Sequence, residues 1–112
     1  RNAIEKNGER FLKRVFTDGE ITYCQNRKAT KWLSFAARFA AKEAVSKALG
    51  TGFAKGVTPS DIEVVMHDNG EPEIVLYNEA LRYYNKMRGE SISVSMSHTD
   101  THAIAMVVVS TG

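Results

Sequence analysis

Residues 38–50 read RFAAKEAVSKALG, and this stretch decides how the first half of the chain folds. Its small and straight-chain residues favour a helix, and Gly50 is typical of the position just past a helix end. Successive helical residues turn by about 100°, so Glu43 and Lys47 lie on one face, one turn apart. An ordinary helical ion pair of this spacing is worth about 0.2–0.5 kcal/mol and is the plainest interpretation of the two residues.

The helical wheel separates this pair from the polar side of the helix. The polar side is formed by three other residues: Ser34, Arg38 and Lys42. The pair falls instead beside small residues, next to the apolar stripe: Ala36, Ala40 and Ala44. We therefore expect Glu43 and Lys47 to be partly desolvated, with room beside them for a ligand. Such an arrangement would suit a metal ligand and a phosphate-binding lysine.

Three further motifs follow the same order along the chain: Phe16-Thr17-x-x-Glu20, Asp61-Ile62-Glu63-Val64 and Ser95-Met96-Ser97-His98-Thr99. Together with the stretch Arg-Phe-Ala-Ala-Lys-Glu-Ala and the following Lys-Ala-Leu-Gly-Thr-Gly, they resemble the signature of holo-acyl-carrier-protein synthases. These are the small, stand-alone 4'-phosphopantetheinyl transferases. The resemblance covers essentially all of residues 1–112, which we interpret as a single domain.

Composition fits a small globular protein. The chain has 112 residues, of which 43% are hydrophobic and 25% charged. No apolar run approaches the ~20 residues of a membrane span, and no secretory signal is visible. Cys24 is the only cysteine, which excludes an internal disulfide and fits a small buried hydrophobe better than a nucleophile. We expect a cytoplasmic protein that does not bind membranes.

The net charge of +2 hides a division between the two halves. Residues 1–47 carry 11 Lys and Arg against 5 Asp and Glu, whereas the remainder carries 4 against 8. The basic half predicts an acidic protein partner or a polyphosphate ligand. Nucleic acid is the less favoured partner, because the chain has no Arg/Gly-rich run, no ribonucleoprotein motif and no zinc finger.

The first half is predicted to be helical. Residues 10–16 form a short helix whose apolar face is expected to hold four residues: Phe11, Leu12, Val15 and Phe16. Thr17 and Glu20 have the spacing of a capping box, so a second helix should begin there and run past Cys24. Thr30 is predicted to cap a long helix over residues 31–49.

The second half is predicted to be rich in strands. Strands are expected over 62–66 and 74–77, joined by a turn at 68–72 that contains Asn-Gly. Asn78 is expected to cap a helix that stops at Gly89. A final pair, 91–97 and 103–109, is joined by the loop 98–102. The fold class is therefore α+β, with helices packed on one face of an antiparallel sheet, as in the 4'-phosphopantetheinyl transferase fold.

The resemblance implies a specific reaction. Coenzyme A would donate its 4'-phosphopantetheine arm to a serine of apo acyl carrier protein, giving holo acyl carrier protein and 3',5'-ADP. Reactions of this kind depend mainly on positioning and on neutralising phosphate charge, and Mg²⁺ is the suitable ion. By resemblance Glu43 is a catalytic residue and a metal ligand, and Lys47 is a catalytic residue that meets the pyrophosphate. The pathway served would be fatty acid biosynthesis in lipid metabolism.

The resemblance also assigns binding residues. Coenzyme A would be bound by five residues: Arg38, Lys47, Gly50, Gly52 and His98. The exposed basic residues of the first helix would dock the acidic carrier protein: Arg10, Lys13 and Arg14. Members of the family are typically homotrimers with active sites between subunits, so we expect the same assembly here.

The chain departs from the family pattern in two places. The second metal carboxylate of the family lies in a Gly-x-Asp strand, which is absent from the sequence beginning at Arg1. Ala37 stands where the family commonly has glycine. A second interpretation therefore stays open, in which the chain is a non-catalytic module that binds an acidic protein through its basic helices.

Overall fold

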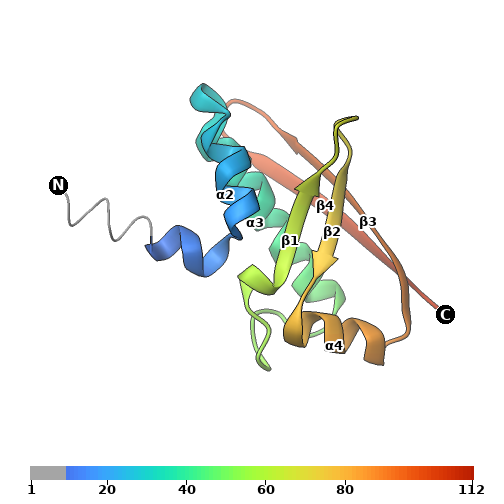
Figure 1. The fold of residues 1–112 in the computed structure, drawn as a ribbon. Coiled ribbons are helices and arrows are strands. Elements are labelled where there is room, and N and C mark those ends of the chain that lie inside the picture. Colours follow the sequence, from blue (N-terminus) through green and yellow to red (C-terminus); the bar gives the residue numbers. More distant parts are fainter. Residues whose placement is uncertain (1–9) are drawn as a thin grey trace.

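The computed structural model describes residues 10–112 and shows an α+β protein (Figure 1). Residues 10–15 are helical and lead into the first labelled helix. The elements then follow in this order: α2 (Asp18–Gln25), η1 (Lys28–Thr30), α3 (Lys31–Ala48), η2 (Pro59–Asp61), β1 (Ile62–Met66), β2 (Pro72–Leu76), α4 (Asn78–Lys86), β3 (Gly89–His98) and β4 (Ala103–Thr111). The predicted helix and strand order is confirmed.

Three predicted helix boundaries lie where the sequence places them, although one of them lacks the expected capping hydrogen bond. The capping box of α2 is confirmed, because Thr17 Oγ1 accepts a hydrogen bond from Glu20 N at 3.2 Å and Glu20 Oε1 accepts one from Thr17 N at 2.9 Å. Gly50 follows the end of α3 with φ 81°, as its sequence position predicts. Thr30 is the N-cap residue of α3, as predicted, but its side chain makes no capping hydrogen bond, because Thr30 Oγ1 donates to Arg27 O in the preceding 3₁₀ turn.

Asn78 is not the helix cap that the sequence predicts. The N-cap of α4 is Tyr77, and Asn78 itself adopts φ 52°. The Asn78 side chain instead donates from Nδ2 to Asp61 Oδ1 at 2.9 Å. Its amide therefore joins the start of α4 to the start of β1, and a long-range partner has displaced the local one.

The strands form two antiparallel hairpins. β1 pairs with β2 from Ile62↔Leu76 to Met66↔Pro72, and β3 pairs with β4 from Gly89↔Thr111 to His98↔Ala103. β2 lies beside β3, but no ladder joins them, so the strands make two two-stranded sheets. Serines and apolar residues alternate along β3, which leaves the serines exposed and the apolar residues half-buried. The α+β class is confirmed, with two hairpins in place of one sheet.

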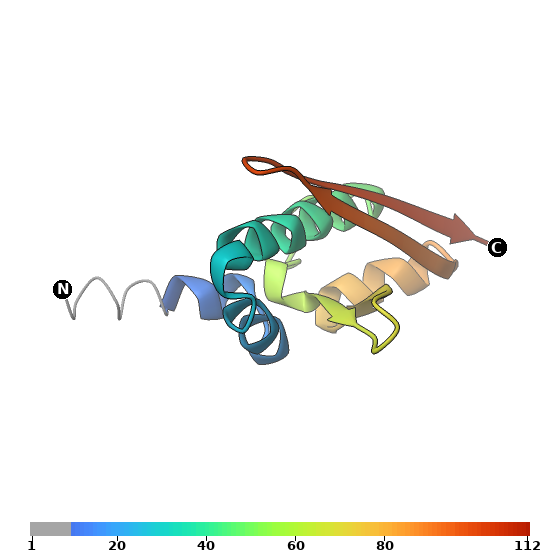
Figure 2. The ribbon, with the colours of Figure 1, turned by 90° about the horizontal axis from the view of Figure 1, so that it is seen from above.

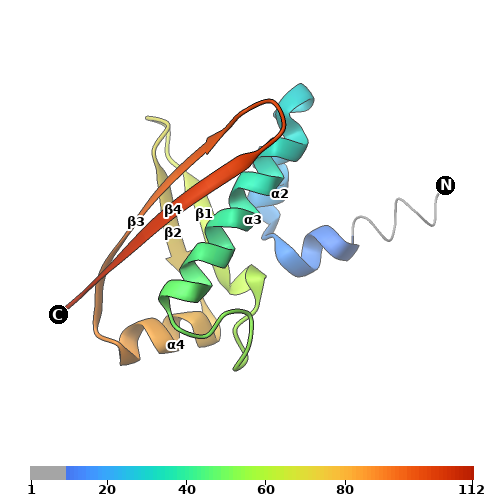
Figure 3. The same ribbon diagram turned by 180° about the vertical axis from the view of Figure 1, so that it is seen from behind.

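The long helix α3 is the centre of the packing (Figures 1 and 3). It contacts the β3–β4 hairpin on one side and α2 and β1 on the other. Seen from above, α3 and the β3–β4 hairpin lie along one side of the molecule and α4 lies opposite (Figure 2). The elements that pack directly on α3 thus include α2, β1, β3 and β4.

Two hydrophobic clusters hold this arrangement. The larger joins α3 to both hairpins and α4: Ala41, Val45, Leu49, Val57, Ile62, Val64, Ile74, Leu76 and Ala80. The smaller joins α2 to the start of α3: Val15, Phe16, Cys24 and Phe35. Each fully buried Val or Ile stabilises the fold by about 1.5–3 kcal/mol relative to exposure. Phe11 does not join them as predicted, since it is 61% exposed.

Among residues 10–112, no helix has the length and apolar character needed to cross a bilayer. This finding agrees with the absence of a long apolar run in the sequence.

Candidate active site

Glu43 and Lys47 lie on the outer surface of α3, one turn apart. Both side chains are exposed, so the predicted partial desolvation is wrong for the single chain. Within the described range no ion pair joins the two, although their spacing permits one. A carboxylate and an ammonium displayed side by side in this way are accessible to a ligand that carries both a metal and phosphate groups.

The helical wheel misplaced the polar side of α3. Ser34, Arg38 and Lys42 are all buried, with Arg38 against Tyr23 of α2 and Lys42 against α2 and β1. The wheel treats Arg and Lys as solvent-facing, but Lys42 has a carboxylate partner and Arg38 has an aromatic one. Of the three small residues beside the pair, Ala36 is exposed and Ala40 and Ala44 are half-buried.

Arg38 points to a different side of α3 from Glu43. Its guanidinium lies over the Tyr23 ring at 4.4 Å, and its Nη1 donates to Ser34 O at 3.3 Å. Its Nε and Nη2 are buried without a hydrogen-bond partner in the part of the chain that the structure describes. Two unused donors in a side chain only 4% exposed would suit an anion, but one chain does not bring them to Glu43.

The turn after α3 uses its amides to end the helix. Gly50 N donates to Lys47 O, and both Thr51 N and Gly52 N donate to Ser46 O. The turn with Gly50 and Gly52, which the resemblance assigns to coenzyme A binding, therefore already uses three of its amides to cap α3. Gly52 adopts φ 57°, and nothing lies within 4 Å of the position its Cβ would occupy, so ligand atoms can still come close to this backbone.

His98 lies at the other end of α3 from Lys47. It ends β3, and the following loop lies beside the first turns of α3 (Figures 1 and 3). Lys47 is in the last turn of this helix of 18 residues, which is about 27 Å long. A single chain therefore does not bring the two residues together.

The three predicted docking residues form a basic surface. Arg10, Lys13 and Arg14 are all exposed on the first helical segment. A cavity of about 240 Å³ opens beside them, lined by Leu12, Lys13, Ile21 and Gln25. Basic side chains next to a partly apolar cavity suit an acidic protein surface that also carries apolar side chains.

A metal site in this chain would depend on Glu43. Among the described residues there is no group of three or more His, Cys, Asp or Glu side chains that could hold an ion. One exposed carboxylate fits Mg²⁺, which keeps several waters and is bound by one or two carboxylates together with substrate phosphates. It would not fit an ion that needs a complete protein cage.

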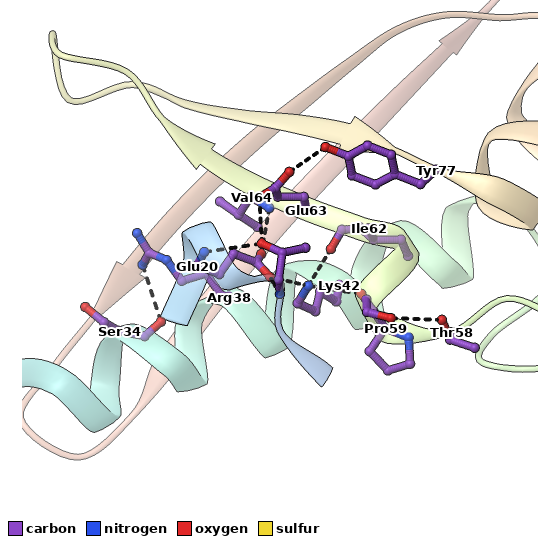
Figure 4. A network of polar contacts seen from close by, with 12 residues as sticks. Glu20, Ser34, Arg38, Lys42, Thr58, Pro59, Ile62, Glu63, Val64 and Tyr77 are labelled. Carbon is purple, nitrogen blue, oxygen red and sulfur yellow. Dashed lines mark hydrogen bonds and ion pairs between the residues drawn. The ribbon is translucent and has the colours of Figure 1, made fainter. Parts of the chain in front are cut away.

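A buried ion pair behind α3 was missed by the sequence analysis (Figure 4). Lys42 Nζ lies 2.7 Å from Glu20 Oε1, and both side chains are fully buried. Desolvation lowers the pKa of Lys42, and the charge and hydrogen bond of Glu20 oppose that effect. The only signal in the sequence was Glu20 itself, which the capping box explained without need of a second partner.

An exposed apolar face on β4 was also missed. Ile104, Met106 and Val108 point away from the core and are 59%, 68% and 57% exposed. They pair with Ser97, Ser95 and Ser93, so the outer face of this hairpin is a strip of serine beside a strip of large apolar side chains. The signal was present in the uninterrupted apolar run 103–109, which leaves no polar face.

Comparison with known proteins identifies the family. The model described as ACPS, the 4'-phosphopantetheinyl transferase superfamily, matches residues 1–107, and the chain belongs to this superfamily. The holo-[acyl-carrier-protein] synthase of Ruminiclostridium cellulolyticum is 47% identical over 112 residues, which is 100% of this chain and 84% of the relative. The enzyme class predicted from the sequence, holo-[acyl-carrier-protein] synthase, is thereby confirmed.

Solved structures agree with this assignment. A Helicobacter pylori holo-[acyl-carrier-protein] synthase in complex with coenzyme A has a TM-score of 0.78 and 36% identity, covering 97% of this chain and 89% of that chain. A Bacillus anthracis holo-(acyl-carrier-protein) synthase in complex with CoA (3',5'-ADP) has a TM-score of 0.76 and 35% identity, covering 99% and 89%. The predicted fold is confirmed by both.

Proposed function

We propose that this chain transfers the 4'-phosphopantetheine arm of coenzyme A to a serine of an apo acyl carrier protein. The observation that carries the proposal is the exposed pair Glu43 and Lys47, one turn apart on α3. This pair belongs to a chain whose relatives are holo-[acyl-carrier-protein] synthases. The products are holo acyl carrier protein and 3',5'-ADP, and the pathway is fatty acid biosynthesis in the cytoplasm.

The chemistry requires little covalent work from the protein. The serine hydroxyl attacks the phosphorus that carries the pantetheine and loses its proton to solvent water, and the bond from that phosphorus to the bridging oxygen breaks as 3',5'-ADP leaves. Lys47 would bind the pyrophosphate and oppose the charge that grows on the leaving group. Glu43 would hold Mg²⁺ together with phosphate oxygens and water, and the ion when bound would neutralise phosphate charge. Where the encoded protein carries a Gly-x-Asp strand before Arg1, its aspartate would supply the second carboxylate.

A complete coenzyme A site would require two copies of the chain. His98 and Lys47 lie at opposite ends of α3. Arg38 is buried on a different side of this helix from Glu43 and Lys47. The exposed apolar face of β4 is a surface on which copies could pack, with Met106 at its centre. This arrangement supports a homotrimer in which each nucleotide end is bound by Arg38 and His98 of one subunit and the pyrophosphate by Lys47 of another.

The assembly has its own test. Met106→Glu would place a charge in the centre of the apolar face and should convert the trimer to monomers in sedimentation. Asn85→Glu, at an exposed position of α4, adds the same charge outside this face and is the matched comparison. A trimer that survives Met106→Glu would contradict the assignment of this face.

The decisive test of function is direct. The purified protein is incubated with coenzyme A, Mg²⁺ and an apo acyl carrier protein, and the carrier is weighed by mass spectrometry. A mass increase equal to one phosphopantetheine is expected, and it should vanish with Glu43→Gln. Binding of the carrier without any mass increase would favour the non-catalytic module and would overturn the proposal.

A further inference from the structure

The buried pair Glu20–Lys42 saturates the donors of the lysine. Lys42 Nζ lies 2.7 Å from Glu20 Oε1 and 3.0 Å from Pro59 O, and it also donates to Ile62 O. An ammonium has three donors, and here each has an acceptor. The Phe16 ring lies 5.4 Å from the same nitrogen. The side chain of Lys42 is therefore fixed in one orientation by contacts with three different segments of the chain (Figure 4).

The carboxylate is held just as firmly. Glu20 Oε1 also accepts from Thr17 N at 2.9 Å, and Oε2 accepts from Val64 N at 2.7 Å. The bond to Val64 fixes the carboxylate against β1, and the bond to Thr17 fixes it against the start of α2. One ion pair thus joins α2, α3 and β1 at a single point.

Stability alone does not account for this pair. Removing two charges from water costs several kcal/mol each, and apolar residues of equal size often serve as well or better. Ala37 and Ala41 on the buried arc of α3 are small and make no directional contact, whereas the Glu20–Lys42 pair is directional. A directional contact can specify one rotation of the helix about its axis.

We propose that the Glu20–Lys42 pair is a positioning device that fixes the rotation of α3, so that Glu43 and Lys47 face the substrates. Glu43 follows Lys42 by one residue, so the direction of Lys42 sets the direction of Glu43 about 100° further around the helix. Lys47 then lies about 140° from Lys42 on the same outer arc. The inference rests on the proposed function for its kinetic test, but its geometric test does not.

The geometric test uses neighbouring positions that differ in exposure. Ala36 is exposed and Ala37 is buried, and the one native thiol, Cys24, is fully buried. Ala36→Cys and Ala37→Cys are made separately in the full protein, and alkylation rates are measured with Glu20 and Lys42 intact. Ala36→Cys should react at least about tenfold faster. With Glu20→Leu and Lys42→Met added, rotation of α3 should reduce this ratio several-fold.

The kinetic test uses the same double replacement without the added thiols. Because a displacement of about 1 Å can cost about 10²-fold in rate, kcat should fall at least tenfold while the circular dichroism spectrum is kept. The KM for the carrier protein, which depends on the first helical segment, should stay nearly unchanged. His67→Gln with Glu73→Gln removes an exposed side-chain contact of 2.8 Å between His67 Nε2 and Glu73 Oε1 and is the matched control, expected to keep wild-type kcat.

The outcomes separate the two proposals. An unchanged alkylation ratio together with unchanged kcat in the folded double variant would overturn the positioning role. If that variant does not fold, Lys42→Arg takes its place, because the wider guanidinium cannot satisfy Glu20, Pro59 O and Ile62 O from one point, and the same two changes are expected. If the wild-type protein transfers no arm, the proposed function fails, and the alkylation ratio alone decides the positioning role.

Discussion

Lys42 and Glu43 are consecutive residues of α3, yet Lys42 is fully buried against Glu20 while Glu43 faces solvent. The helix therefore separates a charge that fixes structure from a charge that is available for chemistry. This separation makes the two residues open to independent test, because replacing the exposed one should leave the packing of the helix intact.

Glu43→Gln is expected to abolish phosphopantetheine transfer without loss of fold. The amide keeps the size of the side chain but loses the charge that a hard cation requires. Transfer is measured by the mass of the carrier protein, and the fold by thermal unfolding. Glu73→Gln, on the exposed side of β2, is the control and should keep full activity. Activity near wild type in Glu43→Gln would remove Glu43 from the site.

Lys47→Ala is expected to weaken the use of coenzyme A by an order of magnitude or more. A charge-assisted contact to phosphate is worth about 1.5–3 kcal/mol, and the exposed Lys47 has no structural role that would mask its loss. The comparison is Lys55→Ala, which removes another exposed lysine from the loop that follows α3. Equal losses of kcat/KM in the two variants would argue against a pyrophosphate contact at Lys47.

Elements could be predicted from local sequence where the deciding contacts are local. The capping box at Thr17, the glycine after α3 and the period-two pattern of β3 all act within a few residues, and all three are confirmed. Asn78 failed as a predicted cap because its amide has a partner 17 residues away in Asp61. Local patterns carry no information about such partners.

The candidate site shows the same limit. Helical spacing correctly places Glu43 and Lys47 one turn apart on one face, but it predicted neither their exposure nor the burial of Arg38 and Lys42. Burial depends on the Tyr23 ring and the Glu20 carboxylate, which the chain brings to α3 only on folding. A helical wheel that assigns every charged residue to solvent therefore misplaces the exposed face wherever the folded chain supplies a buried partner for a charged side chain.

Arg14→Glu is expected to raise the KM for the carrier protein while the KM for coenzyme A changes little. Acyl carrier proteins are acidic, so a reversed charge on the exposed first helical segment replaces attraction by repulsion. The dependence of kcat/KM on salt should also become weaker, because fewer opposite charges remain to be screened. Lys86→Glu, exposed on α4, is the matched control. An unchanged carrier KM in Arg14→Glu would place the docking surface elsewhere.

Gly89→Ala is expected to destabilise the fold by about 1–3 kcal/mol through overpacking. A Cβ at Gly89 would lie 2.1 Å from Tyr84 Cε1, so the ring or the start of β3 must move. Chemical denaturation measures the loss, with Ser91→Ala on the exposed side of β3 as the control. Adding Tyr84→Ala should recover part of the loss relative to the sum of the single changes. Strict additivity would contradict the steric cause.

Cys24 should make the stability of the protein depend on pH in the alkaline range. Burial raises the pKa of the Cys24 thiol from 9.0 to about 11. Between these values the unfolded chain loses the thiol proton while the folded chain keeps it, so the unfolded state binds fewer protons and stability falls as pH rises. This difference in pKa corresponds to about 2–3 kcal/mol of folding stability. That stability is fully present below pH 9 and is lost as the pH rises through about 11. Urea unfolding at pH 8 and at pH 11 measures this loss, and Cys24→Ala should show a smaller decrease by about that amount. Because Cys24→Ala leaves every other titratable group in place, the comparison between the two proteins carries the prediction, and equal decreases in both would show that the thiol ionises alike in the folded and unfolded chain.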